Sequence, residues 1–227
     1  MSHEINMSRI KSLYHALGDL KDEVVFVGGA TVSLYADRAA PEVRETNDVD
    51  IVVQIGSRLD FHEIEKRLWK LGFQNDINSK FLGRYLLSDI VVDVMPTEEK
   101  MLGFLNKWFI KGFETAIDYI IDDKSIIKIF TAPYFIASKI EAFKNRGNDD
   151  GRTSSDFEDI VFILENRSSI WKEMDNIDPP LRDYLLNEFT NFNNYPHIEE
   201  WIGSHSSFYS PPSVYFIMED MKNFLAG

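Results

Sequence analysis

A predicted strand that carries two aspartates on one face constrains this chain more than any other segment. Residues 48–54 form an apolar run that begins with Asp48 and Asp50, and alternate strand residues point to the same face. An unpaired carboxylate in an apolar strand is costly, and two that lie side by side repel each other. Asp93 interrupts a second apolar run, residues 89–95, in the same way. The three aspartates therefore predict a site for a hard cation such as Mg²⁺, which prefers oxygen ligands.

A pair of glycines follows the strand predicted at residues 23–27. Gly28 and Gly29 let the backbone approach a ligand and direct N–H groups at it, and a helix expected over 30–36 would favour a phosphate at its N-terminus. Thr31 could donate its hydroxyl to that phosphate or cap the helix. Taken alone, the glycine pair fits an ordinary tight turn at least as well. Beside the aspartates, it favours metal-assisted phosphoryl or nucleotidyl transfer.

Strand patterns dominate the chain up to about residue 130, and helical patterns dominate after it. This distribution predicts an α/β fold in two domains, with a sheet domain at 1–128 and a helical domain at 129–227 that closes the nucleotide cleft. A loop is predicted at 37–46, and further strands at 80–87 and 126–130. Helices are predicted at 5–19, 59–71, 133–146, after Ser155, at 180–191 and at 211–225.

The composition excludes several classes of protein and site. The chain has no cysteine, which excludes disulfides, thiolate zinc sites and cysteine nucleophiles, and we expect a cytoplasmic protein. No apolar run approaches the length of a membrane span, so we expect no membrane partner. The net charge of −13 disfavours a general nucleic-acid binder but leaves room for a local basic groove.

Lys139 lies at the edge of the apolar stripe of the helix predicted at 133–146. Its amino group could extend to water along that stripe, or it could reach a triphosphate in a cleft between the domains. Asp156 and Asp159 lie three residues apart on the next helix, where they could pair with Lys139 or Arg146.

These residues resemble the signature of the polymerase-beta-like nucleotidyltransferase superfamily, which has a glycine turn after the first strand, Asp-x-Asp on the next and a third acid later. The chain resembles in particular the abortive-infection toxin nucleotidyltransferases of the AbiEii and AbiGii type. The resemblance covers about residues 23–165 and is carried by Arg44-x-Thr46-x-Asp48-x-Asp50, Lys139-x-x-Ala142-x-x-x-Arg146 and Asp156-x-x-Asp159-Ile160. It implies a mixed sheet with flanking helices, followed by a C-terminal helical domain.

The resemblance also implies an activity, the transfer of a nucleoside monophosphate from an NTP to an acceptor hydroxyl. It implies that Asp48 and Asp50 hold two Mg²⁺ ions, while Asp93 completes one metal shell and could take the acceptor's proton. Lys139 would neutralise the triphosphate. The expected nucleotide-binding residues are Gly28, Gly29, Thr31, Thr46, Lys139 and Asp159.

The acceptor stays open at this point. The resemblance favours RNA, such as a tRNA end, and a toxin–antitoxin setting with an antitoxin protein as partner. The acceptor could also be a small molecule, such as an aminoglycoside, or a protein hydroxyl. A non-catalytic nucleotide-binding module that retains the acids is the alternative from a different class.

Overall fold

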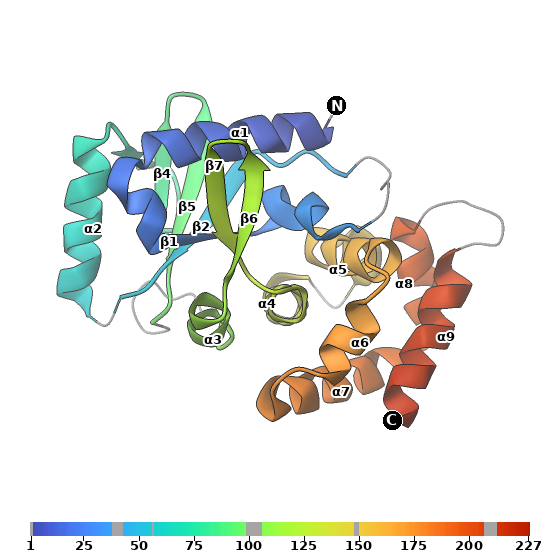
Figure 1. The fold of residues 1–227 in the computed structure, drawn as a ribbon. Coiled ribbons are helices and arrows are strands. Elements are labelled where there is room, and N and C mark those ends of the chain that lie inside the picture. The colour runs from blue at the N-terminus through green and yellow to red at the C-terminus, as the bar shows by residue number, and fades with distance from the viewer. Residues whose placement is uncertain (1, 38–42, 56, 99–105, 148–149, 207–212) are drawn as a thin grey trace. The chain divides into compact units, whose positions relative to one another are not determined.

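The computed structural model describes residues 2–37, 43–55, 57–98, 106–147, 150–206 and 213–227. Over these residues the chain has an α/β fold with a mixed sheet, and helices predominate toward the C-terminus (Figure 1). The chain divides into two compact units. The sheet unit comprises Met1–Thr31 and Glu42–Thr131, and the helical unit comprises Val32–Pro41 and Ala132–Gly227. The α/β class predicted from the sequence is confirmed, and the helical unit also includes a segment from the N-terminal part.

The described residues form one seven-stranded sheet with the order β3-β4-β5-β2-β1-β7-β6. The strands are β1 Val24–Val27, β2 Asp48–Val53, β3 Gln74–Asn75, β4 Arg84–Leu87, β5 Ile90–Pro96, β6 Ile117–Asp122 and β7 Ser125–Ile129. β1 pairs antiparallel with β2, and β2 pairs parallel with β5. All four residues of β1 are buried, as the apolar run predicts for a central strand covered on both faces.

The helices of the sheet unit are α1 Ser2–Ala16, α2 Arg58–Lys70 and α3 Phe109–Glu114. α1 packs against β2 and β7 (Figure 1). It ends before the predicted residue 19 because Gly18 has a φ of +53°, a left-handed conformation that stops the helix. A 3₁₀ helix, Gly18–Glu23, continues the chain toward β1.

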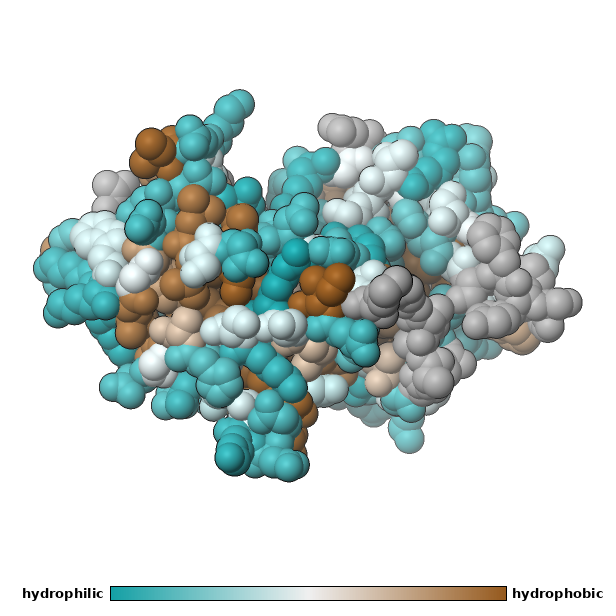
Figure 2. Space-filling view, turned by 90° about the horizontal axis from the view of Figure 1, so that it is seen from above, coloured by the Kyte–Doolittle hydropathy of each residue, from teal (hydrophilic) through white to brown (hydrophobic). Residues whose placement is uncertain are grey.

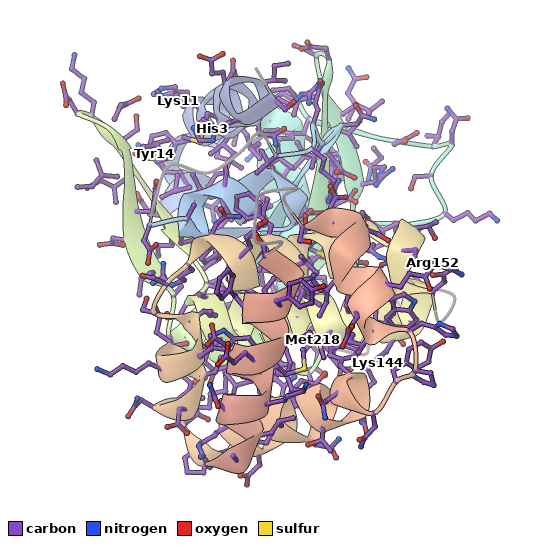
Figure 3. The ribbon with its side chains drawn as sticks, turned by 90° about the vertical axis from the view of Figure 1, so that its right-hand side faces the viewer. His3, Lys11, Tyr14, Lys144, Arg152 and Met218 are labelled. Carbon is purple, nitrogen blue, oxygen red and sulfur yellow. The ribbon has the colours of Figure 1, made fainter. Side chains whose placement is uncertain are left out.

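The helical unit consists of α4 Ala132–Arg146, α5 Ser155–Asn166, α6 Ile170–Asp175, α7 Pro179–Asn193, α8 Ile198–His205 and α9 Ser213–Ala226. Its core is rich in aromatic rings. Phe157 lies among Phe143, Phe192 and Trp201, with ring centroids 5.4–5.6 Å from its own. Met218 of α9 is also buried in this unit (Figure 3).

Several elements differ from the sequence-based predictions for local reasons. The strand predicted at 80–87 begins only at Arg84, because the residues before it form a turn in which Arg84 N–H donates to the carbonyl of Phe81. The helix predicted at 30–36 is a 3₁₀ helix, Gly29–Tyr35. The elements β3, α3, β6, α6 and α8 were not predicted. Residues 38–42 of the predicted loop and 211–212 of the last predicted helix lie outside the described residues.

Candidate active site

The three predicted acids lie together on two neighbouring strands. Asp48 and Asp50 are at the start of β2, and the parallel pairing with β5 places Asp93 beside Asp50 in register. Neighbouring strands are about 4.8 Å apart, so these carboxylates share one small region of the sheet face. Asp93 is buried, and the side chain of Asp48 is 37% exposed. The shared face predicted from strand alternation is therefore present.

A cation already lies among these acids. Arg84 Nε donates to Asp93 Oδ1 and Arg84 Nη2 donates to Asp93 Oδ2, both at 2.7 Å. The same Nη2 lies 3.3 Å from Oδ2 of Asp48. Hydrogen bonding with Asp93 raises the pKa of the Arg84 guanidinium above its usual range, against the effect of burial, and the charges of Asp48 and Asp50 add to this. The guanidinium is thus a permanent cation held by the acids.

The glycine turn approaches the acids closely. Gly28 has a φ of +76°, and a Cβ added to it would lie 1.8 Å from Oδ2 of Asp50. A Cβ added to Gly29 would lie 2.3 Å from Nη2 of Arg44. Gly28 therefore excludes a side chain by its conformation and its space, while a side chain at Gly29 would require Arg44 to shift.

The two predicted threonines have structural partners in the sheet unit. Thr31 is fully buried, and its hydroxyl donates to the carbonyl of Gly28 at 2.9 Å, so it stabilises the turn. The hydroxyl of Thr46 and its backbone N–H both donate to Oδ1 of Asn6 on α1, at 3.3 and 3.1 Å. Asn6 Nδ2 donates in turn to the carbonyl of Arg44. α1 therefore fixes the chain just before it enters β2.

The acid cluster suits a hard cation by its chemistry. Its donors are carboxylate oxygens on adjacent strands, next to a glycine where a Cβ would fill the space beside Asp50. Each carboxylate has about four lone-pair sites, so the two bonds from Arg84 leave acceptor capacity on Asp93. Across the described ranges, no three His, Asp or Glu side chains are arranged to hold a metal ion. The donor atoms are of the type that Mg²⁺ prefers, but their present positions serve Arg84.

The helical unit contains a second group of predicted residues. Lys139 Nζ on α4 lies 2.6 Å from Asp159 Oδ2 and 3.2 Å from Asp156 Oδ1, both on α5. Arg146 donates to both oxygens of Asp156 at 2.7 and 2.8 Å. The predicted pairing of these acids with Lys139 and Arg146 is confirmed. Lys139 is only 6% exposed, so the alternative in which it extends to water is wrong.

The ionised state of Asp156 results from opposing effects. Burial alone would raise the pKa of its carboxyl, but the hydrogen bonds and charge of Arg146 and the charge of Lys139 outweigh burial and lower that pKa. Ser154 caps α5 by accepting from Phe157 N–H, so Asp156 lies in the first turn. A carboxylate there also interacts favourably with the helix dipole.

Sequence reasoning missed two residues of the sheet unit. Arg84 lies opposite Asp93 in the antiparallel β4–β5 pair, and a hairpin turn at Ser88 and Asp89 would have indicated this register. Ser88 has a φ of 55°, as such two-residue turns require. Asn6 is completely buried, and it lies four residues before Ile10 on the buried stripe of α1. This helical spacing is the signal that could have placed it on the core face.

The predicted residues do not line the open groove found elsewhere in the sheet unit. This groove, of about 490 Å³, runs along one side of α1, where His3, Lys11 and His15 line it together with Ile121 of β6. Figure 3 shows His3 and Lys11 along α1, and Lys11 pairs with Asp122. Figure 2 looks down on the side that carries α1 and shows hydrophobic and hydrophilic residues interspersed there. The acids, and not this groove, are the candidate site.

Comparisons with known proteins add no family to this geometry. No protein-family model matches the chain, and no curated protein matches its sequence.

Proposed function

We propose that the chain is a Mg²⁺-dependent nucleotidyltransferase that moves a nucleoside monophosphate from an NTP to an acceptor hydroxyl. One observation carries the proposal: Asp48, Asp50 and Asp93 gather on one face of two parallel strands, directly beside the Gly28 turn. Three carboxylates on a sheet face are costly unless a cation serves them. Arg84 supplies one positive charge to these three acids, which leaves them a net negative charge for a metal ion to neutralise.

The proposed reaction assigns each residue a task. The acceptor oxygen attacks the α-phosphorus, a new O–P bond forms, and the bond to the bridging oxygen breaks, so pyrophosphate leaves. Asp93 accepts the proton of the acceptor hydroxyl. Bound Mg²⁺ supplies neutralisation of the phosphate charge, and Asp48 and Asp50 would hold it with Asp93. Gly28 and Gly29 keep the turn free of side chains, so that phosphates can approach the backbone.

The residues of the helical unit remain separate predictions. Lys139 and Asp159 are proposed to contact the nucleotide, and the described contacts of Lys139 are to Asp156 and Asp159. A binding role would require its amino group to exchange one of these partners for a phosphate. NTP affinity in Lys139→Met, compared with Lys172→Met at a position on α6, tests that role.

Transfer is tested by incubating the purified chain with each α-labelled NTP, Mg²⁺ and total tRNA, and by separating the products on a gel. Label on RNA that disappears with Asp50→Asn supports the proposal. Asp118→Asn is the matched control, since Asp118 is an exposed aspartate on β6, opposite Lys128 and outside the cluster. Equal transfer by wild type and Asp50→Asn would remove the proposed role of the acids.

A second candidate function has one specific observation in its favour. Arg84 already neutralises part of the acid charge, which suits a nucleotide-binding module that does not turn over. Such a module would bind NTP and release no pyrophosphate in the presence of Mg²⁺. A coupled pyrophosphate assay separates the two candidates.

We propose RNA, in particular a tRNA end, as the acceptor, and a cytoplasmic setting with an antitoxin partner. The support is the sequence resemblance and the absence of cysteine. Among the described helices, none has the length and apolar character needed to span a membrane. Growth arrest on expression, relieved by Asp48→Ala, would support the toxin setting. Label on the protein itself or on an aminoglycoside instead would assign one of the other acceptors.

A further inference from the structure

We infer that Arg84 is a built-in counter-cation of the acid cluster, which competes with a divalent metal ion for Asp48 while it retains Asp93. The inference rests on the proposed function, because it concerns the same acids. It adds a positioning residue that the sequence patterns did not include. It also specifies which carboxylate changes partner when a metal ion binds.

The two contacts of Arg84 are unequal, and the difference identifies the carboxylate that is released. Two parallel N–H bonds of 2.7 Å hold Asp93, whose side chain is 12% exposed. A single contact of 3.3 Å reaches Asp48, whose side chain is 37% exposed. Bidentate pairs between arginine and a carboxylate are strong and geometrically specific, while a long contact to a half-exposed acid is weak. Asp48 is therefore the acid that a metal ion can take from Arg84.

The strand register forces Arg84 toward the acids. Arg84 pairs with Asp93 and Tyr85 pairs with Val92 across the β4–β5 hairpin. Tyr85 is fully buried on the opposite face, and its hydroxyl donates to Glu65 at 3.0 Å. Because successive strand residues point to opposite faces, burial of Tyr85 directs Arg84 to the face of the acids.

The charges explain why an arginine there is compatible with metal binding. Asp48, Asp50 and Asp93 contribute −3 and Arg84 contributes +1, so these four side chains carry a net charge of −2. Without Arg84, three carboxylates would face each other at −3. Removing the guanidinium should therefore destabilise the metal-free protein and strengthen the binding of a divalent ion.

Arg84→Gln is the main variant, since it removes the charge and keeps an amide donor. Arg84→Lys keeps the charge and loses the two parallel bonds. Arg67→Gln is the matched control, because Arg67 forms a similar bidentate pair with Glu23, at 2.7 and 2.9 Å, away from the acids. Mn²⁺ serves as the probe and is titrated against each protein by electron paramagnetic resonance. Tm is measured in EDTA and in Mg²⁺.

We expect Arg84→Gln to bind Mn²⁺ at least tenfold more tightly than wild type, which corresponds to about 1.4 kcal/mol. Its Tm should be lower than that of wild type in EDTA, and Mg²⁺ should raise its Tm by more. Arg67→Gln should show the wild-type response to both ions, and Arg84→Lys should bind Mn²⁺ within threefold of wild type. An Mn²⁺ affinity of Arg84→Gln within twofold of wild type would overturn the inference, and so would equal tightening in Arg84→Lys.

These readouts do not require catalysis, so the inference and the proposed function can fail separately. Nucleotide transfer by wild type, together with an unchanged Mn²⁺ affinity in Arg84→Gln, overturns the inference alone. Tighter Mn²⁺ binding in Arg84→Gln, with no transfer to any acceptor by wild type, supports the inference and removes the enzymatic proposal.

Discussion

The carboxylate of Asp50 lies where a side chain on Gly28 would have to be, with Oδ2 only 1.8 Å from the position of an added Cβ. Val27 pairs with Asp50 across the antiparallel β1–β2 ladder, so the turn begins directly beside the acid. The glycine and the aspartate therefore depend on each other for space. The glycine pair and the aspartate-bearing strand, which both indicated a site in the sequence, are therefore in direct contact.

Gly28→Ala should move Asp50 and lower both stability and nucleotide transfer. The left-handed conformation alone costs an alanine about 1–2 kcal/mol, and the contact with Asp50 adds to it. Gly72→Ala separates the two effects, because Gly72 has a φ of +93° and an added Cβ would meet nothing within 4 Å. Urea denaturation and the labelled-NTP assay provide the measurements. Equal losses of transfer in the two variants would mean that the Asp50 contact is unimportant.

Asn6→Ala should make residues 44–46, which lead into β2, less firmly held. It should therefore reduce nucleotide transfer, although Asn6 itself lies on α1. The change leaves the N–H of Thr46 and the carbonyl of Arg44 without their buried partner, at a cost of about 1–3 kcal/mol in the free energy of unfolding. Ser8→Ala is the control, since Ser8 is exposed on the same helix. Stability of Asn6→Ala that matches Ser8→Ala would show that α1 does not hold this segment.

Asp156→Asn should destabilise the helical unit by about 3 kcal/mol at pH 7, because it removes one partner from a buried group of charges. The pKa of Asp156 is lowered in the fold, so its ionised form stabilises the fold above the unfolded-state pKa of about 3.9. This contribution is lost as the pH falls through the lower folded-state pKa.

The difference in unfolding free energy between wild type and Asp156→Asn should therefore be constant from pH 7 to about pH 5 and should decrease below about pH 4. Urea titrations across this range measure it, with Asp183→Asn, an exposed position on α7, as control. A difference that grows toward low pH would contradict the assignment of an ionised, paired Asp156.

Phe157→Ala should remove the centre of the aromatic core of the helical unit. Its ring contacts Phe143, Phe192 and Trp201, and large-to-small changes of buried aromatic residues cost about 3–5 kcal/mol. Phe216→Ala is the control, because Phe216 on α9 is 54% exposed. Near-equal Tm values for the two variants would contradict the proposed importance of this cluster.

Strand alternation and helical spacing correctly predicted which face of an element several site residues occupy. Alternation placed Asp48 and Asp50 on one face, and helical spacing placed Asp156 and Asp159 within reach of Lys139. The sheet class followed from the distribution of strand and helix patterns. These features need only the period of the element that carries them.

Two features that depend on distant pairing were not predicted. The role of Asn6 depends on its hydrogen bonds to the backbone of Arg44 and Thr46, which lie about forty residues away in the sequence. The position of Arg84 follows from the register of the β4–β5 hairpin, in which Ser88 takes the left-handed conformation of a two-residue turn. Tertiary contacts of this kind leave no local period.

The order of the strands leaves β6 at one edge of the sheet. The unpaired backbone groups of an edge strand can form hydrogen bonds with a strand of another molecule. β6 carries Asp118 and Asp122, and its register against β7 shifts between Ile120 and Asp122. A second β6 that approached this edge would meet like charges and an irregular ladder. The acidic residues and the irregular ladder therefore disfavour the pairing of this edge with a second β6.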